Sequence, residues 1–221
     1  MPQRIAVLIV AGLLGSCASS PLDVLQKTTV AIDPGHGGPH SGVAGPSGLL
    51  EKDVNLHVAL ALQEILRSWG VRVVMTREND VSLSMEVEDD IAARRRLANV
   101  SNAELLISIH SNYCSNSDVR GFQVWVPKAV EGARDGQNRA LAARVRSELV
   151  RFWGQHDLGT RDDHDLLLLR EAACAAVLVE LECLSNPEVE KELSQPTVHR
   201  KLAQGLAHAI RDWVLTREDR R

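Results

Sequence analysis

The chain has 221 residues, which is enough for one domain of ordinary to large size but tight for two. Its composition of 44% hydrophobic and 24% charged residues excludes a wholly disordered protein. The net charge of −4 argues against a nucleic-acid partner, because proteins that bind nucleic acid normally carry a basic surplus. With only 3% aromatic residues, a broad aromatic groove for sugar rings or bases is also disfavoured.

The N-terminus carries the pattern of an export signal. A positive charge in Met1–Arg4 precedes Ile5–Gly15, an uncharged apolar run of eleven residues that is too short to span a bilayer. The run leads into Leu14–Cys17, which resembles the lipobox of bacterial lipoproteins. We therefore expect a lipid anchor at Cys17, and the alternative is an ordinary signal peptide cut near Ala18. Because Ala18 is not an aspartate, we expect sorting to the outer membrane, facing the periplasm.

Four segments follow from this pattern. Residues 1–17 are the predicted lipoprotein-type signal peptide, 18–27 a short tether, 28–216 one folded domain, and 217–221 a charged tail. No repeat, charge block or linker rich in proline and glycine interrupts the long segment, so a single domain is predicted. We expect the protein to be monomeric.

Within the domain, apolar spacing alternates between the periods of strands and helices. The predicted elements, in chain order, are strand Thr28–Asp33, helix Glu51–Trp69, strand Val71–Thr76, helix Glu86–Asn99, strands Glu104–Ile109 and Gly121–Val126, helix Asn138–Trp153, strands Asp165–Leu169 and Ala176–Glu180, and helices Pro187–Leu193 and Pro196–Thr216. This alternation predicts an α/β fold in which roughly six strands form a mostly parallel or mixed sheet, flanked by about five helices.

Candidate metal ligands lie where predicted strands end. His36 follows the first strand in a loop rich in glycine, and His110 follows a later strand at the equivalent place. Glu51 opens the first long helix, where a carboxylate also simply complements the helix dipole. Two histidines and one glutamate together match the ligand set of a catalytic zinc site, whose fourth position stays open to water. The sequence therefore predicts one Zn²⁺ at the carboxyl ends of the strands.

A further carboxylate ends the most apolar strand. Glu180 follows Ala176–Val179 directly, and burying an unpaired carboxylate is costly, so a chemical role is indicated. Glu182 lies two residues further on and would share its side of the strand if the strand continues. We assign the catalytic role to Glu180 because it comes directly off the apolar run.

Several motifs occur together in one order: DPGHGG at 33–38, LLEKDVNL at 49–56, Thr76-Arg77, SIHSN at 108–112, and VLVELECLSNPEVEKEL at 177–193. This set resembles the zinc-dependent N-acetylmuramoyl-L-alanine amidases of the bacterial cell wall, the third amidase class. The resemblance covers roughly Thr28–Trp213, so residues 28–216 are predicted to be a catalytic amidase domain. The chain departs from the family pattern at His40, at Glu182-Cys183 and at Ala175-Ala176.

The resemblance implies a peptidoglycan substrate and a specific chemistry. His36, Glu51 and His110 would be the zinc ligands, and Glu180 aligns with the catalytic glutamate. The bond cleaved would be the amide between the lactyl group of N-acetylmuramic acid and the L-alanine of the stem peptide. Two other functions stay open, namely a zinc carboxypeptidase acting on the stem peptide and a non-catalytic lipoprotein that binds peptidoglycan.

Two predictions concern the surroundings of the site. Cys114 and Cys183 each lie a few residues beyond a catalytic strand end, so a bridge between them is expected in an oxidising compartment, whereas Cys174 precedes its strand and should lie at the opposite edge. Family members that serve cell division carry a blocking helix after the strand that follows SIHSN. Here only the ten residues Lys128–Gln137 separate that strand from the next helix, which predicts an open site.

Overall fold

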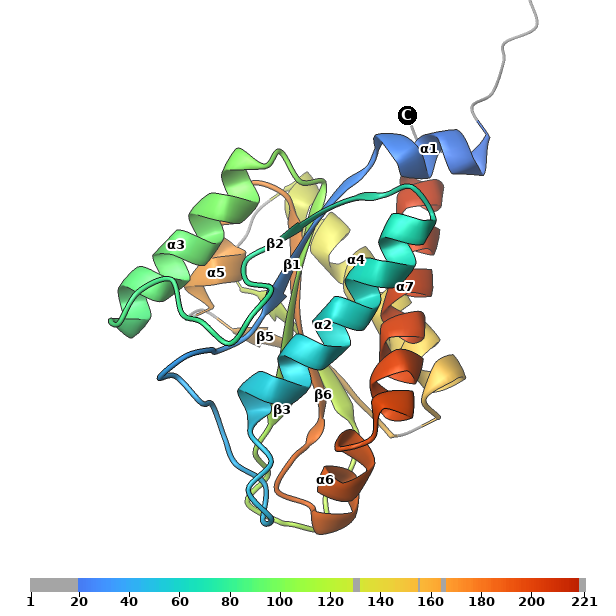
Figure 1. The fold of residues 1–221 in the computed structure, drawn as a ribbon. Coiled ribbons are helices and arrows are strands. Elements are labelled where there is room, and N and C mark those ends of the chain that lie inside the picture. The colour runs from blue at the N-terminus through green and yellow to red at the C-terminus, as the bar shows by residue number, and fades with distance from the viewer. Residues whose placement is uncertain (1–19, 129–131, 155, 164–165, 219–221) are drawn as a thin grey trace, which may run out of the picture.

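The computed structural model describes residues 20–128, 132–154, 156–163 and 166–218. A central sheet lies between two layers of helices (Figure 1). Its strands are β1 (Thr29–Pro34), β2 (Arg72–Met75), β3 (Leu105–Asn112), β4 (Phe122–Pro127), β5 (Asp157–Asp163) and β6 (Ala175–Cys183), arranged in the order β2-β1-β3-β6-β4-β5. The predicted α/β class with six strands is confirmed.

The sheet is mixed, as predicted. The neighbours β2, β1, β3 and β6 run parallel, β4 is antiparallel to β6, and β5 is parallel to β4. The carboxyl ends of β1, β3 and β6 therefore meet at one edge of the sheet, the lower edge in Figure 1. In the register of β3 and β6, His110 pairs with Glu180. Two candidate site residues that are far apart in sequence are thus cross-strand neighbours.

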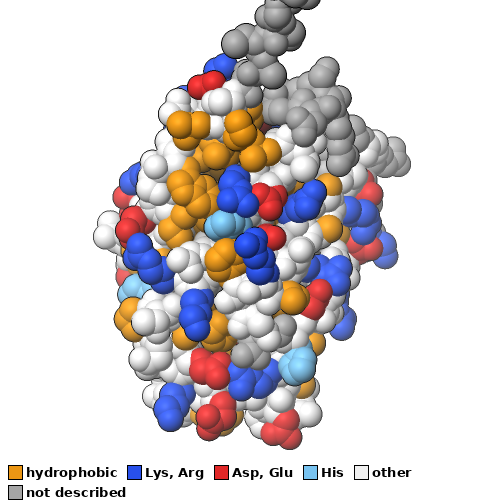
Figure 2. Space-filling model, turned by 90° about the vertical axis from the view of Figure 1, so that its right-hand side faces the viewer, with side chains coloured by type: hydrophobic (Ala, Val, Ile, Leu, Met, Phe, Trp, Pro, Cys, Tyr) orange, Lys and Arg blue, Asp and Glu red, His pale blue; other side chains and the backbone are white. Residues whose placement is uncertain are grey.

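Seven described helices surround the sheet. They are α1 (Pro21–Lys27), α2 (Glu51–Ser68), α3 (Val87–Val100), α4 (Ala133–Phe152), α5 (Leu167–Arg170), α6 (Pro187–Leu193) and α7 (Pro196–Glu218). The helices α2, α4 and α7 cover one face, while α3 and α5 cover the other (Figure 1). Figure 2 shows the face around α7, where acidic and basic side chains are interspersed and no single sign of charge dominates.

The core is divided by the sheet into a large and a small part. The large part packs the apolar stripes of α2, α4 and α7 against β1, β3 and β6, with Val58, Leu62, Ile107, Val179 and Leu206 among its fully buried side chains. The small part lies under α3 and α5 and includes Leu106, Leu169 and Leu178. Burial on both faces explains why the central strands read as continuous apolar runs.

Three predicted boundaries are corrected by the structure. The segment Pro21–Lys27, predicted as part of a tether, forms α1, which Ser20 caps and which buries Leu25. Residues Leu167–Leu169, predicted as the end of a strand, lie in the helix α5, and the strand next to β4 is instead Asp157–Asp163. Helix α4 begins at Ala133, five residues before the predicted start.

The short connection before α4 bears on the predicted open site. Strand β4 ends at Pro127 and α4 begins at Ala133, so only residues 128–132 separate them, of which 129–131 lie outside the described part. Five residues are too few for a blocking helix with its two linkers. This connection is even shorter than the sequence predicts.

The predicted disulfide is present, and Cys114 is bonded to Cys183 across 69 residues of sequence. Cys174 is not bonded to either of them and precedes β6, as expected. The predicted signal peptide, with its lipobox Cys17, lies outside the described residues. Among the residues that are described, no helix combines the length and the apolar character needed to cross a membrane.

Candidate active site

The loop after β1 presents His36 in an unusual backbone conformation. His36 has a φ of 62°, in the left-handed region that non-glycine residues rarely occupy. The preceding residue also lacks space, because a Cβ atom at Gly35 would lie 2.2 Å from the His110 ring. The DPGHGG sequence is therefore needed to bring the His36 loop against the imidazole of the neighbouring strand.

Glu51, at the first position of α2, joins the two imidazoles. Its Oε1 lies 3.2 Å from His36 Nε2 and 2.9 Å from His110 Nδ1. The candidate ligand atoms of these three residues all lie within 4.8 Å of one another, and this is the one such cluster found among the described residues. The fold thus brings together the three residues that the sequence predicts as metal ligands.

The second oxygen of Glu51 is held by the loop that precedes α2. Val43 N donates to Oε2 at 2.9 Å, while Ser111 N and the Asn55 amide donate to Oε1 at 3.2 and 3.4 Å. Burial opposes ionisation of this carboxyl, which is only 3% exposed, but hydrogen bonds from His110 and His36 hold its pKa well below the usual range. Glu51 is therefore a carboxylate at any physiological pH.

These donors fit a zinc ion. Two imidazole nitrogens and one carboxylate oxygen are the ligands of many catalytic zinc sites, which leave the fourth position to water or substrate. The ionised Glu51 supplies negative charge where a cation would lie. Burial opposes protonation of His110, but its hydrogen bond to Glu51 and the charge of Glu180 raise the pKa of the imidazole. A cation in the cluster would compete with that proton.

Glu180 lies on β6 beside this cluster and differs from it chemically. Its Oε2 atom is buried and has no hydrogen-bond partner among the described residues. Burial raises the pKa of Glu180 to about 7, with a smaller opposing effect from His110. A carboxyl group with a pKa near neutrality accepts and returns a proton readily, which is the property of a general base.

Glu182, the alternative considered in the sequence, is engaged in structural contacts. It is fully buried, and its two oxygens accept hydrogen bonds from Gly121 N at 2.6 Å and from Trp153 Nε1 at 2.8 Å. These bonds tie β6 to β4 and to the end of α4. The two carboxylates of β6 therefore have different surroundings, and only that of Glu180 has an oxygen without a partner among the described residues.

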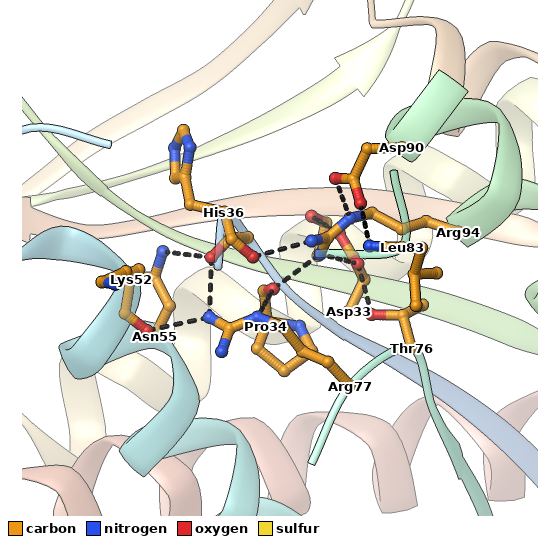
Figure 3. Close-up of polar contacts among 12 residues, drawn as sticks. Asp33, Pro34, His36, Lys52, Asn55, Thr76, Arg77, Leu83, Asp90 and Arg94 are labelled. Atoms are coloured by element: carbon orange, nitrogen blue, oxygen red, sulfur yellow. Dashed lines mark hydrogen bonds and ion pairs between the residues drawn. The ribbon is translucent and has the colours of Figure 1, made fainter. Parts of the chain in front are cut away.

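Two buried arginines, Arg77 and Arg94, hold the His36 loop by hydrogen bonds to its backbone (Figure 3). Arg94 of α3 donates to Asp33 Oδ1, to Pro34 O and to His36 O, at 3.0, 2.8 and 2.7 Å. Arg77 donates to Pro34 O and Gly35 O, both at 2.9 Å. Four of these five bonds satisfy the backbone carbonyls of Pro34, Gly35 and His36, and the fifth reaches the Asp33 side chain.

Asp33 completes this network from the end of β1. It accepts hydrogen bonds from Thr76 and Ser108 as well as from Arg94, and although burial opposes ionisation, the charge of Arg94 and these bonds lower its pKa. The sequence flagged Asp33 and Thr76-Arg77 but missed Arg94, which stands in a run of three arginines. Nothing in that run distinguishes the buried Arg94 from Arg95, which is partly exposed.

The sequence also missed Asn55, one turn after Glu51. Its side chain donates to Gly35 O at 3.3 Å and accepts from Ser111 Oγ at 3.2 Å, so it connects α2, the His36 loop and β3. The spacing of four residues from Glu51 is the signal that places it on the same helix face. Asn112, the last residue of the SIHSN motif, accepts a hydrogen bond from Leu184 N through its backbone carbonyl.

A cavity of about 420 Å³ opens beside the cluster, between α3 and α5. One end is lined by His36, His110 and Gly42, and the other by the apolar side chains of Val87, Ile91, Leu166, Leu167, Leu168 and Leu178. The charged groups in its wall, Asp33, Asp90 and Arg94, are bonded to one another. The cavity thus offers a mostly apolar wall next to the candidate ligands.

A family model described as N-acetylmuramoyl-L-alanine amidase matches residues 30–212. The chain belongs to this family. The germination-specific N-acetylmuramoyl-L-alanine amidase of Bacillus subtilis is 32% identical over 194 residues, which cover 84% of this chain and 79% of that relative. The match includes all the strands of the sheet except the first residue of β1.

Solved structures of amidases share the fold. The CwlD amidase of Clostridioides difficile, in complex with the GerS lipoprotein, aligns with a TM-score of 0.78 and 28% identity over 86% of this chain and 99% of that one. An N-acetylmuramoyl-L-alanine amidase of Clostridium difficile 630 aligns with a TM-score of 0.76 and 31% identity over 87% and 97% of the two chains. The amidase fold is therefore present almost in full.

Proposed function

We propose that this protein is a zinc-dependent peptidoglycan amidase that hydrolyses the bond between the lactyl group of N-acetylmuramic acid and L-alanine. The observation that carries the proposal is the convergence of His36, Glu51 and His110 beside a carboxyl group, Glu180, whose pKa lies near neutrality. Membership of the amidase family supports the choice of bond. The apolar cavity beside the cluster offers room for the groups that flank that bond.

In this proposal His36, Glu51 and His110 hold the zinc ion. When bound there, zinc supplies a Lewis acid that polarises the carbonyl group and makes water a stronger acid. The protein preorganises these ligands, because Arg94 and Arg77 hold the His36 loop and Val43 holds Glu51 by hydrogen bonds. Such support from surrounding groups is what orients metal ligands in other sites.

Glu180 acts as the general base and then as the acid. It removes a proton from the attacking water as the bond to the carbonyl carbon forms, and it returns a proton to the amine nitrogen of L-alanine as the amide bond breaks. The products are a free lactyl carboxyl group on the sugar and a stem peptide with a free amino terminus. The buried Oε2 without a partner among the described residues favours this role, since no competing hydrogen bond there has to be broken.

The test of the activity is identification of the cleaved bond. The protein lacking residues 1–17 is incubated with zinc and purified muropeptides, and the products are identified by mass. We expect intact stem peptides that begin with L-alanine, released without any other protein because the connection between β4 and α4 leaves no room for a blocking helix. Release of single C-terminal amino acids would indicate a carboxypeptidase, and unchanged muropeptides would indicate a binding protein without activity.

We further propose that the enzyme is exported and anchored by a lipid at Cys17 to the outer membrane, facing the periplasm. The apolar run and lipobox of residues 1–17 support this placement. The test is labelling of cells with an alkyne analogue of palmitate. Label on the wild-type protein in the outer-membrane fraction, and no label on Cys17→Ser, is the expected result; a soluble and unlabelled wild-type protein would contradict it.

A further inference from the structure

A further buried carboxylate of the C-terminal part, Glu190 of α6, holds the loop that leads to Glu51. Its side chain is only 4% exposed. Its two oxygens share the N–H group of Ser47, at 2.9 and 2.8 Å, and one of them also accepts from Leu49 N at 3.0 Å, across more than 140 residues of sequence. Although burial opposes ionisation, these backbone donors lower the pKa of Glu190.

The loop is shaped around this carboxylate. Gly45 N donates to Leu49 O at 2.9 Å, and Ala44 forms a bridge with Leu50, so residues 45–49 close into a turn whose inner N–H groups face Glu190. A Cβ atom at Gly45 would lie 2.3 Å from Glu190 Oε1. The glycine is therefore required for the carboxylate to enter the turn.

The turn of residues 45–49 also determines where α2 begins. Its N-cap residue, Leu50, provides no side-chain hydrogen bond, so backbone carbonyls must satisfy the first N–H groups of the helix. Glu51 N donates to Val43 O at 2.9 Å and Lys52 N to Ser41 O at 3.1 Å. Val43 N donates back to Glu51 Oε2 at 2.9 Å. The position of the Glu51 carboxylate thus depends on the backbone on the N-terminal side of the turn.

We infer that Glu190 is a positioning residue for metal binding, which fixes Glu51 through the turn of residues 45–49. The inference rests on the proposed role of Glu51 as a zinc ligand. Without the Glu190 carboxylate, the Ser47 and Leu49 N–H groups lose their acceptor and the turn is free to rearrange. The carboxylate of Glu51 then loses its fixed orientation before zinc binds.

The experiment measures zinc affinity by competition with a chromophoric chelator, at a temperature well below the unfolding of each variant. We expect Glu190→Ala to bind zinc about 10- to 100-fold more weakly than the wild type, the range typical for residues that support metal ligands. Glu190→Gln keeps one acceptor oxygen, so its zinc affinity should lie between those of the wild type and Glu190→Ala. The control is Glu188→Ala, an exposed glutamate of the same helix, which should bind zinc as the wild type does.

A second variant reaches the same contact from the loop. Gly45→Ala forces its new methyl group against the Glu190 side chain and should weaken zinc binding to a similar degree. In the double variant Gly45→Ala/Glu190→Ala the clash is absent, so the two effects should be far from additive. Hydrogen exchange of the metal-free proteins should show faster exchange at the Ser47 and Leu49 amides in each single variant.

The outcomes separate the inference from the proposed function. Wild-type affinity for zinc in folded Glu190→Ala, or strictly additive losses in the double variant, would overturn the inference while leaving the metal site intact. Failure of the wild type itself to bind zinc would refute the proposed metal site and with it this role of Glu190.

Discussion

Two carboxyl groups next to His110, Glu51 and Glu180, have opposite properties. Glu51 stands at a helix start, where Val43, Ser111 and the two histidines surround it with donors, and its pKa is lowered far below the usual range. Glu180 stands on an apolar strand, one of its oxygens has no partner among the described residues, and its pKa is raised to about 7. Glu51 is buried and Glu180 is half-buried with its Oε2 atom enclosed, and desolvation raises the pKa of each, so burial alone does not explain the difference.

The comparison shows that hydrogen-bond donors decide which role each carboxylate can take. Desolvation raises the pKa of both groups, but at Glu51 the bonds from His110 and His36 outweigh it. A permanently ionised carboxylate suits a metal ligand, whereas a carboxyl group that titrates near neutrality suits proton transfer.

The largest effect separates the two roles directly. Glu180→Gln should lower kcat for muropeptide hydrolysis by about 10²- to 10⁴-fold, the usual contribution of a general base, and should retain zinc. Glu51→Gln should lose activity and zinc together, because a ligand is removed. The measurements are turnover and metal content after gel filtration. Glu182→Gln is the matched control on β6; its folded form should keep both properties, and a loss of activity confined to Glu182→Gln would reverse our assignment.

The second prediction concerns the disulfide at the end of the Glu180 strand. Because it closes a loop of 69 residues, replacing both cysteines in Cys114→Ala/Cys183→Ala should cost about 4 kcal/mol of unfolding free energy. Zinc affinity of the folded variant should stay unchanged, since neither cysteine belongs to the cluster of candidate ligands, His36, Glu51 and His110. Urea unfolding measures the first quantity. Equal stability of this variant and the control Cys174→Ala would contradict the prediction.

The third prediction uses the stability of the metal-free protein at pH 8. The pKa of Glu180 is raised from 4.5 to about 7, so the folded state keeps a proton that the unfolded state loses, and stability falls as the pH rises between these values. Glu180→Gln should therefore stabilise the protein by up to about 3 kcal/mol. For Glu51 the effect on stability has the opposite sign, since folding favours its ionised form. Glu51→Gln should therefore lower the free energy of unfolding at pH 8. If both variants changed this free energy in the same direction, the proposed contrast between Glu51 and Glu180 would be wrong.

The smallest effect is the pH dependence of turnover. If Glu180 is the base, kcat should fall tenfold per pH unit below its pKa in the loaded enzyme. That pKa should lie between the ordinary 4.5 and about 7, because a bound cation favours the ionised form. Glu51 should add no ionisation in this range. Metal content is measured at every pH, so that the fall in kcat caused by protonation of Glu180 is separated from a fall caused by loss of zinc. A kcat that stays constant from pH 4.5 to 8 would exclude Glu180 as the base.

Much of the fold could be read from the sequence because the central strands and long helices carry regular apolar spacing. The strand Asp157–Asp163 could not, since it lies at the sheet edge, is largely exposed and contains almost no apolar residues. The apolar run that ends at Leu169 was wrongly predicted as a strand, because a short helix over the sheet buries leucines as a strand does. Both errors arise where pairing with β4 or packing on the sheet overrides local pattern.

The candidate ligands could be predicted from the sequence, because glycines and strand ends mark His36 and His110 and a helix start marks Glu51. The sequence also predicts Glu180 as the base, but it gives no sign of Glu190, and only the tertiary structure shows the different surroundings of these acidic residues. The order of the sheet puts Glu180 beside His110, and packing of α6 on the loop before α2 brings Glu190 to Ser47. A carboxylate's pKa and role follow from the donors around it, and those donors come from parts of the chain that sequence spacing does not connect.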